Sequence, residues 1–339
     1  MICRNLKLLS TVLFCIAIPF KLPTSSSADE IDPPLTTPKQ GTVTLLKSLD
    51  NEHLESQTLE PTSRQEPPSN AVSTAKTFDP LLDGRDTGAD NAAWVNVEDY
   101  DLPPTRGGTT RAIRTWTKPY ESRGISRKTD FDGSEVWVSY CAILGQDWNP
   151  DANMKFPGLS SATTSGASKP EDFATAKGGQ GGGGGGGNRS WSARGQISSA
   201  TWRIPGALGH EIYHKNSTSR RDDGRIYGET LWLGKSLTSP TPTDEASIAD
   251  NQWHCIKHHA KLNTVKQDDG ILETWLDDTL LFSRDDFNLS DNDDYRNISF
   301  WLQLYHGGLP DTTGTEHSVF FADFTYATGD VDTTHCTCK

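Results

Sequence analysis

Residues 190–196 carry polar side chains suited to binding the carboxylate of an acidic sugar. In an extended strand, Ser192, Arg194 and Gln196 share one face, because successive side chains alternate between faces. Arginine binds carboxylates through two parallel hydrogen bonds. The alternative is a polar strand face that is only exposed to water. We interpret the segment as a surface strand that can hold a sugar carboxylate.

Residues 209–216 add a candidate for proton transfer. Glu211, Tyr213 and Lys215 share one strand face, whereas His214 lies on the other. A tyrosine beside cations can act as base and acid if its pKa falls toward neutrality. The competing interpretation is a tyrosine that packs its ring and exposes its hydroxyl.

Two further segments carry candidate sugar contacts. Lys155 precedes Phe-Pro-Gly and is expected in a loop or at a strand entry. In 298–305, Trp301, Gln303 and Tyr305 lie on one face and aliphatic residues on the other. The aliphatic face predicts core. The aromatic face suits a platform for sugar rings, and an inter-sheet tryptophan is the alternative.

The elements that must position these residues are strands, because the hydrophobic periodicity is two and no window predicts an amphipathic helix. A hairpin is expected around Asp277-Asp278. We predict an all-β fold, a jelly-roll β-sandwich of antiparallel sheets. The expected strands beyond the segments above are 135–144, 253–262, 271–276, 279–282 and 318–326.

The first 28 residues are expected to be a signal peptide. A basic start with Arg4 and Lys7 is followed by an apolar run and a cluster of small residues that ends at Ala28. The apolar run is short for a membrane span, so no membrane attachment is expected after cleavage. Residues 29–76 are rich in Pro, Ser and Thr and predict a disordered linker. The folded domain is expected at 77–339.

The charge of the chain restricts its partners. The formal net charge is -13, and since the signal peptide carries three basic residues and no acid, the mature chain is near -16. This argues against nucleic acid as a partner. An anionic substrate would need a local basic cleft, which can act within a Debye length of about 8 Å.

The cysteines and sequons agree with export. After the signal peptide an even number of cysteines remains, which suggests disulfides, and the sequence leaves all three pairings open. We expect Cys336 or Cys338 to tie the tail to Cys141 or Cys255. A zinc site is the alternative, but the spacing fits no common finger. Sequons stand at Asn188, Asn216, Asn288 and Asn297.

Metal and phosphate sites are not expected. The glycine run 181–187 predicts a surface loop, because no Lys-Ser/Thr follows as in a phosphate loop. The paired aspartates match no calcium-loop spacing and predict turns. We expect His254, His258 and His259 to be core or surface side chains rather than metal ligands.

The order of several motifs resembles polysaccharide lyase family 14, which holds alginate lyases and related glucuronate-cleaving enzymes. The resemblance spans roughly Val136 to Tyr326. It implies a β-jelly roll whose concave face holds an acidic polysaccharide, cleavage by β-elimination, no cofactor and a monomer. The motifs are Lys155-Phe-Pro-Gly-Leu159, Trp191-Ser-Ala-Arg194, Ile212-Tyr-His214, Tyr227-Gly228, Trp253-His-Cys-Ile256, Leu262-Asn-Thr264, Asp269-Gly-Ile271, Trp275-Leu-Asp277 and Tyr305-His-Gly-Gly308.

The resemblance also assigns residues. The expected catalytic residues are Tyr213, Lys155 and Arg194. Glu211 stands where the family's first tyrosine of a Tyr-x-Tyr strand is expected, so it can pair with Arg194 or change the preferred sugar. The residues expected to bind substrate are Ser192, Glu211, His214, Gln303 and Tyr305.

Two other functions remain open from the sequence. A non-catalytic carbohydrate-binding protein would keep the aromatic face and would not need Lys155 or Tyr213. A glycoside hydrolase would need two carboxylates about 5–10 Å apart across a cleft. Glu135, Glu211 and Glu273 are candidates for it, and nothing in the sequence pairs them.

Overall fold

The computed structural model describes residues 75–121, 123–151, 153–161, 191–200, 204–214, 228–289, 297–306, 314–332, 334–335 and 338. They form two antiparallel sheets, one of eight strands and one of seven. The expected all-β sandwich is therefore confirmed. The expected signal peptide, nearly all of the expected linker, the glycine run, Lys215 and Tyr227 lie outside the described residues.

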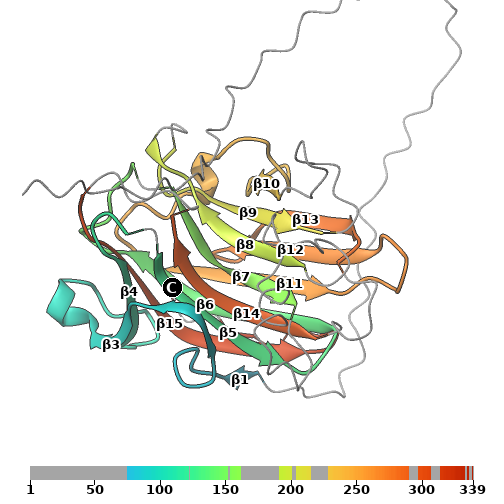
Figure 1. Cartoon of the computed structure of the whole chain (residues 1–339), viewed down its shortest axis with the longest axis horizontal. Helices are drawn as coiled ribbons and strands as arrows, with labels where there is room; N and C mark the ends of the chain where they lie inside the picture. Colours follow the sequence, from blue (N-terminus) through green and yellow to red (C-terminus); the bar gives the residue numbers. More distant parts are fainter. Residues whose placement is uncertain are drawn as a thin grey trace, which may run out of the picture. The chain divides into compact units, whose positions relative to one another are not determined.

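The larger sheet has the strand order β13-β12-β11-β6-β15-β4-β3, and β1 pairs with the end of β15 (Figure 1). All of its strand pairings among the described residues are antiparallel. Its strands are β1 (Lys76–Thr77), β3 (Ala92–Asn96), β4 (Arg111–Thr117), β6 (Glu135–Leu144), β11 (His254–Lys261), β12 (Gly270–Leu276), β13 (Thr279–Phe287) and β15 (His317–Thr328).

The smaller sheet has the strand order β10-β9-β8-β7-β14-β5-β2. In Figure 1, β9, β8, β7 and β14 run side by side across the domain. Its strands are β2 (Arg85–Asp90), β5 (Arg123–Phe131), β7 (Met154–Ser161), β8 (Ser192–Ile197), β9 (Leu208–Tyr213), β10 (Glu229–Trp232) and β14 (Ile298–Tyr305).

Alternating side chains of both sheets meet in one hydrophobic core. Tyr140 of β6 packs against Phe300 of β14, with ring centroids 5.4 Å apart. Phe156 of β7 packs against Phe321 of β15 at 5.3 Å. Burying a large apolar side chain contributes about 1.5–3 kcal/mol, so these contacts fix which face of each strand turns inward. The residues between them must then lie on the outer faces.

The predicted hairpin is confirmed. β12 and β13 pair through a turn at Asp277 and Asp278, whose φ angles are 52° and 66°. Two successive residues at positive φ are typical of the tight turn that matches strand twist, and aspartate tolerates this conformation. The expected strand 298–305 has the same bounds as β14.

Of the two expectations for Lys155, a loop or a strand entry, the structure shows the second, because Lys155 is the second residue of β7. Pro157 is accommodated there because the pairing of β7 with β8 shifts between Phe156 and Leu159. A bulge removes the need for the ladder hydrogen bond that proline cannot donate.

Helical structure in the described residues is limited to short 3₁₀ turns, which include η1 (Val97–Tyr100) and η3 (Asp244–Ala246). No helix in this part of the chain has the length and apolar character needed to cross a membrane.

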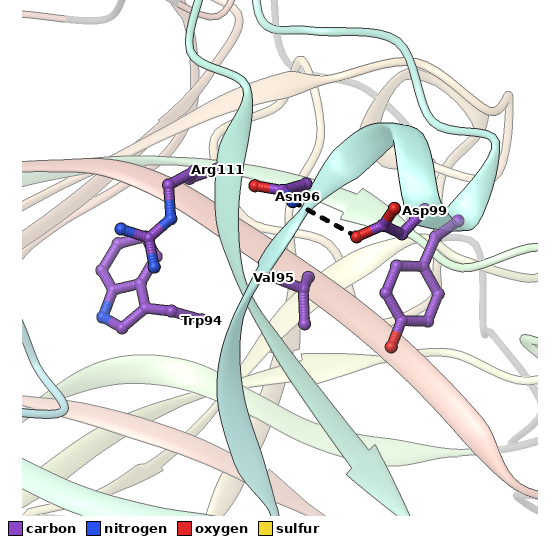
Figure 2. Close-up of a pocket in the computed structure, with 6 residues that line it drawn as sticks. Trp94, Val95, Asn96, Asp99 and Arg111 are labelled. Atoms are coloured by element: carbon purple, nitrogen blue, oxygen red, sulfur yellow. Dashed lines mark hydrogen bonds between the residues drawn. The ribbon is translucent and has the colours of Figure 1, made fainter.

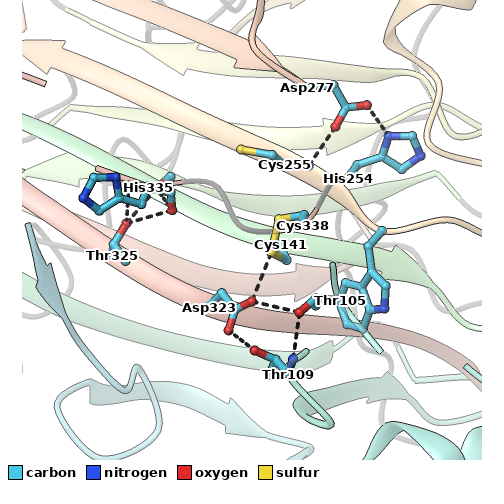
Figure 3. The surroundings of a disulfide bond; sticks show 12 residues. Thr105, Thr109, Cys141, His254, Cys255, Asp277, Asp323, Thr325, His335 and Cys338 are labelled. Atoms are coloured by element: carbon cyan, nitrogen blue, oxygen red, sulfur yellow. Dashed lines mark hydrogen bonds and ion pairs between the residues drawn. A yellow bond between two sulfur atoms is a disulfide. The ribbon is translucent and has the colours of Figure 1, made fainter. Parts of the chain in front are cut away.

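A disulfide joins Cys141 of β6 to Cys338 near the C-terminus (Figure 3). The expectation that a C-terminal cysteine ties the tail to Cys141 or Cys255 is therefore confirmed. Beside the disulfide, Asp323 accepts hydrogen bonds from the hydroxyls of Thr105 and Thr109. The tail is thus fastened over the outer face of the larger sheet.

The three histidines of β11 occupy separate polar environments. His258 lies in the core, between the hydroxyls of Tyr140 and Thr274. His254 lies between two aspartates, and His259 between two glutamates on the outer face. Among the described residues, no group of three or more His, Cys, Asp or Glu side chains is placed to hold a metal ion.

Candidate active site

The outer face of the smaller sheet collects polar side chains from adjacent strands. On β8 and β9, Arg194 is paired with Glu211 and Ser192 with Tyr213. Lys155 of β7 stands opposite Gln196 of β8 and Tyr305 of β14. The pairing occurs because Phe156, Ala193 and Ile212, which alternate with these residues, are buried in the core.

Two glycines allow β7 and β8 to approach closely at this point. A Cβ atom at Gly158 would lie 2.2 Å from the carbonyl oxygen of Ala193 and 2.9 Å from the Cα of Arg194. A Cβ at Gly195 would lie 2.4 Å from the carbonyl oxygen of Pro157. Larger residues would push the two strands apart, so these glycines set the distance between Lys155 and Arg194.

The carboxylate of Glu211 is the centre of the site. Its Oε2 lies 2.5 Å from Nη2 of Arg194 and 2.7 Å from Nζ of Lys155. The hydroxyl of Tyr213 donates a hydrogen bond to Oε1 over 2.9 Å. Lys155 also donates to Oε1 of Gln196 over 3.1 Å. Glu211 therefore links the two cations and the tyrosine into one cluster.

Burial and charge shift the pKa values of this cluster in different directions. Burial by itself would raise the pKa of Glu211, but the charges of Arg194 and Lys155 lower it to about 2. Burial lowers the pKa of Lys155, against the attraction of Glu211. Burial, together with the charge of Glu211, raises the pKa of Tyr213 well above its usual value. In the resting site Tyr213 is therefore protonated and Glu211 is ionised.

Aromatic rings hold Arg194 in place. Its Cζ lies 5.2 Å from the ring centroid of Tyr213 and 5.7 Å from that of Trp301. The indole of Trp301 donates to the hydroxyl of Ser126 over 3.0 Å, and Nζ of Lys128 lies 4.5 Å from its ring centroid. Trp301 is only 3% exposed. It supports the cations from below and does not form the exposed sugar platform that the sequence suggested.

Several buried polar atoms on this face have no hydrogen-bond partner among the residues that the structure describes. They are Oγ of Ser192, Nε of Arg194 and Oε1 of Gln303. An unsatisfied buried polar atom costs about 1–3 kcal/mol. All three atoms lie on the face of the sheet that carries the Glu211 cluster.

The structure brings most of the predicted site residues to this face. Lys155, Arg194, Glu211 and Tyr213 are in direct contact through Glu211, as described above. Ser192, Gln303 and Tyr305 lie on the same face of the adjacent strands. The pairing of Glu211 with Arg194, raised from the sequence as one possibility, is present.

His214 is not brought to this face. Its ring packs edge-on against Phe287 of the larger sheet, with centroids 4.9 Å apart, and its Nε2 lies 3.3 Å from Glu229. The physical reason is the two-residue alternation of the strand, because His214 follows Tyr213 and points to the opposite side.

Two residues of the site were not among the predicted ones. Gln196 accepts from Lys155 and donates to Asn153 over 3.3 Å. Its place on one face with Ser192 and Arg194 was the sequence signal for it. Gly228 packs on the site from the side, because a Cβ there would lie 2.6 Å from Cγ of Glu211. No sequence signal indicates that contact.

The pair of carboxylates that a glycoside hydrolase needs is not formed around Glu211 among the described residues. Glu135 and Glu273 are instead paired with each other through His259, on the outer face of the other sheet. The two sets lie on opposite sheets of the sandwich.

A separate open cavity of about 520 Å³ lies at β3 and η1 (Figure 2). Arg111 lies over the ring of Trp94, with its Cζ 5.6 Å from the centroid. In Figure 2, on the other side of β3, the side-chain amide of Asn96 donates a hydrogen bond to the carboxylate of Asp99. None of the predicted site residues lines this cavity.

Residues 116–324 match the family model of polysaccharide lyase 14, and this range contains all the site residues named above. No curated protein matches the chain.

Solved structures with a similar fold include three enzymes. One is the alginate lyase of Aplysia kurodai, at 14% identity and a TM-score of 0.47, covering 66% of this chain and 84% of that one. Another is the alginate lyase of a Chlorella virus, at 13% identity and a TM-score of 0.44, covering 65% and 85%. The third is an endo-β-1,4-glucuronan lyase of Trichoderma reesei, at 15% identity and a TM-score of 0.43, covering 74% and 92%.

Proposed function

The chain belongs to polysaccharide lyase family 14, and we propose that it cleaves a uronate-containing polysaccharide, alginate or glucuronan, by β-elimination. The observation that carries the proposal is the contact of Lys155, Arg194 and Tyr213 around one point of the outer sheet face. On the same face, Oγ of Ser192 and Oε1 of Gln303, which have no hydrogen-bond partner among the described residues, supply further hydrogen-bonding capacity for a sugar.

The reaction has a simple balance of atoms. A base takes the proton from C5 of the uronate, and the electron pair of that C–H bond forms the C4=C5 double bond. The bond between C4 and the glycosidic oxygen breaks, and the oxygen leaves with the electron pair and takes a proton from an acid. Negative charge grows on the C6 carboxyl group when C5 is deprotonated, so a cation beside that group lowers the barrier.

The site residues fit these three tasks. Arg194 faces the carboxyl group, because its Nε has no protein partner among the described residues and its guanidinium is fixed by two rings. Tyr213 is protonated and donates a proton to the leaving oxygen, since its pKa is raised by burial and by Glu211. Lys155, whose pKa is lowered by burial, accepts the C5 proton in its neutral form.

We further propose that the protein is exported and acts outside the cell as a monomer. The basic and apolar start of the sequence supports export. The disulfide between Cys141 and Cys338 agrees with it, because disulfides persist in oxidising compartments.

The test is incubation of the purified protein with alginate and with glucuronan. Ultraviolet absorbance of an unsaturated product is expected from one or both polymers. New reducing ends without unsaturation would mean hydrolysis, and retention of polymer without cleavage would mean a binding protein. Either result would contradict the proposal.

A further inference from the structure

Glu211 is an unexpected group at the centre of a site for an acidic sugar. Its side chain is 16% exposed and contacts both cations of the site, at 2.5 Å and 2.7 Å. A carboxylate at that position uses the same guanidinium and ammonium groups that would neutralise a uronate. Like charges placed together in an interface repel each other and weaken binding.

The charges in direct contact can be counted. Once Lys155 has taken the C5 proton, Lys155 and Arg194 each carry a positive charge, Glu211 carries a negative charge, and Tyr213 is still neutral. The cluster therefore carries one net positive charge. On β5, which is separated from β7 by β14, Lys128 lies over Trp301 and Asp130 accepts a hydrogen bond from Ser299, and neither is in contact with the Glu211 cluster through the interactions described.

One net positive charge on the cluster is enough to neutralise an intermediate with a single negative charge. Deprotonation at C5 of a free uronate produces a dianion, which leaves the cluster with an excess of negative charge. Deprotonation at C5 of a uronate ester produces a singly charged enolate, which the cluster neutralises. An ester also makes the adjacent C–H bond more acidic than a carboxylate does, since the carboxylate already carries the charge that the reaction increases.

We propose that Glu211 is a specificity-determining residue, and that the site prefers uronate residues whose carboxyl group is esterified at the cleavage point. This inference rests on the proposed function. Discrimination by a repulsive group in the site is a general route to specificity, because the wrong ligand meets an unfavourable charge.

The charge of the whole chain supports this preference independently. The formal net charge is -13, and it repels a polymer with one negative charge per sugar. Esterification removes charge from the polymer and with it the repulsion. The elimination needs no further reactant, because the ester carbonyl stays intact: the C5 proton goes to the base, and the leaving oxygen takes a proton from the acid.

The experiment compares initial rates on alginate and glucuronan before and after methyl esterification, at pH 6 and with enzyme-free controls for spontaneous elimination. The wild-type protein is expected to release unsaturated product from the esterified polymers about 10-fold faster or more, since tenfold corresponds to 1.4 kcal/mol of discrimination. Glu211→Gln removes the charge and keeps the shape. It is expected to lower the ratio of the two rates about 10-fold, mainly by raising the rate on the free acid.

Glu273→Gln is the matched control, because Glu273 is a partly buried carboxylate in an ion cluster on the other sheet. It should leave the ratio of rates unchanged. Glu211→Tyr, which restores the tyrosine implied by the family resemblance, is a second variant that should also shift the ratio toward the free acid. Circular dichroism checks that each variant folds.

The outcomes separate the inference from the function. A wild-type ratio below one, or a ratio that neither Glu211 variant changes, overturns the role of Glu211 and leaves the lyase activity standing. A loss of activity on both polymer forms in both variants would make Glu211 a positioning residue for Lys155 and Tyr213, and the inference would be wrong. No unsaturated product from any polymer would contradict the proposed function itself.

Discussion

The outer faces of the two sheets each carry an ion cluster built around one side chain. On the smaller sheet, Glu211 is held by two cations and a tyrosine. On the larger sheet, His259 lies between Glu273 at 2.8 Å and Glu135 at 3.0 Å. Trp137 stacks on the imidazole, with ring centroids 3.8 Å apart. Both clusters are largely buried and geometrically well defined.

The difference between the two clusters is their charge balance. Burial lowers the pKa of His259, but the hydrogen bonds that its imidazole donates to both glutamates raise it overall, so the imidazole is cationic at mildly acidic pH. With Lys261 bound to Glu135 at 3.3 Å, positive and negative charges cancel. The Glu211 cluster carries one uncompensated positive charge once Lys155 is protonated, and on the same face Oγ of Ser192 and Oε1 of Gln303 have no hydrogen-bond partner among the described residues. The comparison suggests a rule: a buried ion cluster with no net charge contributes to stability, whereas one with a net positive charge can bind an anion.

The strongest test of this comparison is Arg194→Ala. Removing the cation that faces the carboxyl group is expected to lower the elimination rate by about 10²–10³-fold, the scale for one electrostatic stabiliser of a transition state. Arg114→Ala is the control, because Arg114 pairs with Asp147 and Glu316 on the larger sheet. Equal losses of rate in the two variants would contradict the assignment of Arg194.

The next largest effect is expected from the proton-transfer residues. Tyr213→Phe and Lys155→Ala should each lower the ultraviolet signal of unsaturated product by about 100-fold, the usual scale for general acid–base groups. Tyr326→Phe and Lys257→Ala, in the larger sheet, serve as controls. A rate like that of the wild type would remove the residue concerned from the mechanism.

The His259 cluster should respond in stability and not in rate. His259→Ala leaves Glu135 and Glu273 without the imidazole between them, and breaking a buried ion pair costs about 3 kcal/mol. Urea unfolding measures the loss, and kcat at 25 °C should stay unchanged. The double variant His259→Ala/Glu273→Gln should regain part of the stability, since one of the two carboxylates is gone. A fall in kcat with unchanged stability would reverse our interpretation of the two clusters.

The smallest expected effect is in the pH dependence of stability. The folded pKa of His259 is raised above its ordinary value near 6.5, so its contribution is present below pH 6.5 and is lost as pH rises through the raised value. The pKa of Glu211 is lowered to about 2, so its contribution is present above pH 4.5 and is lost as pH falls toward 2.

The loss of the His259 contribution at alkaline pH is measured by thermal unfolding between pH 5 and 9. The quantity compared is the stability of the wild type minus that of His259→Gln at each pH. We expect this difference in stability to be largest at the acidic end and to shrink as the pH rises through the raised pKa of His259. The pKa of His254 is also raised, by its hydrogen bonds to Asp277 and Asp250. Both proteins contain His254, so its contribution to stability cancels in the difference. Parallel curves for the two proteins would show that His259 does not couple to stability.

Much of the fold followed from the sequence. The strand 298–305 was predicted with the bounds of β14, and the Asp277-Asp278 turn was placed because only a few residue types accept positive φ. The polar outer faces of β8 and β9 were predictable, because side chains along a strand alternate between its two faces. The sequence left Lys155 between a loop and a strand entry, and the structure places it at the start of β7, where a shift in the pairing with β8 accommodates Pro157.

The sequence by itself determined which residues face outward, since a two-residue period and the burial of apolar side chains leave little choice. It also determined that Glu211 stands at an unusual position beside Tyr213. Only the tertiary structure decided what Glu211 does there. Its contacts with Lys155 and Arg194 cross from β9 to β7 and β8, and such contacts depend on the register of three strands that are distant in sequence. The net charge of the site is therefore a property of the packed sheet.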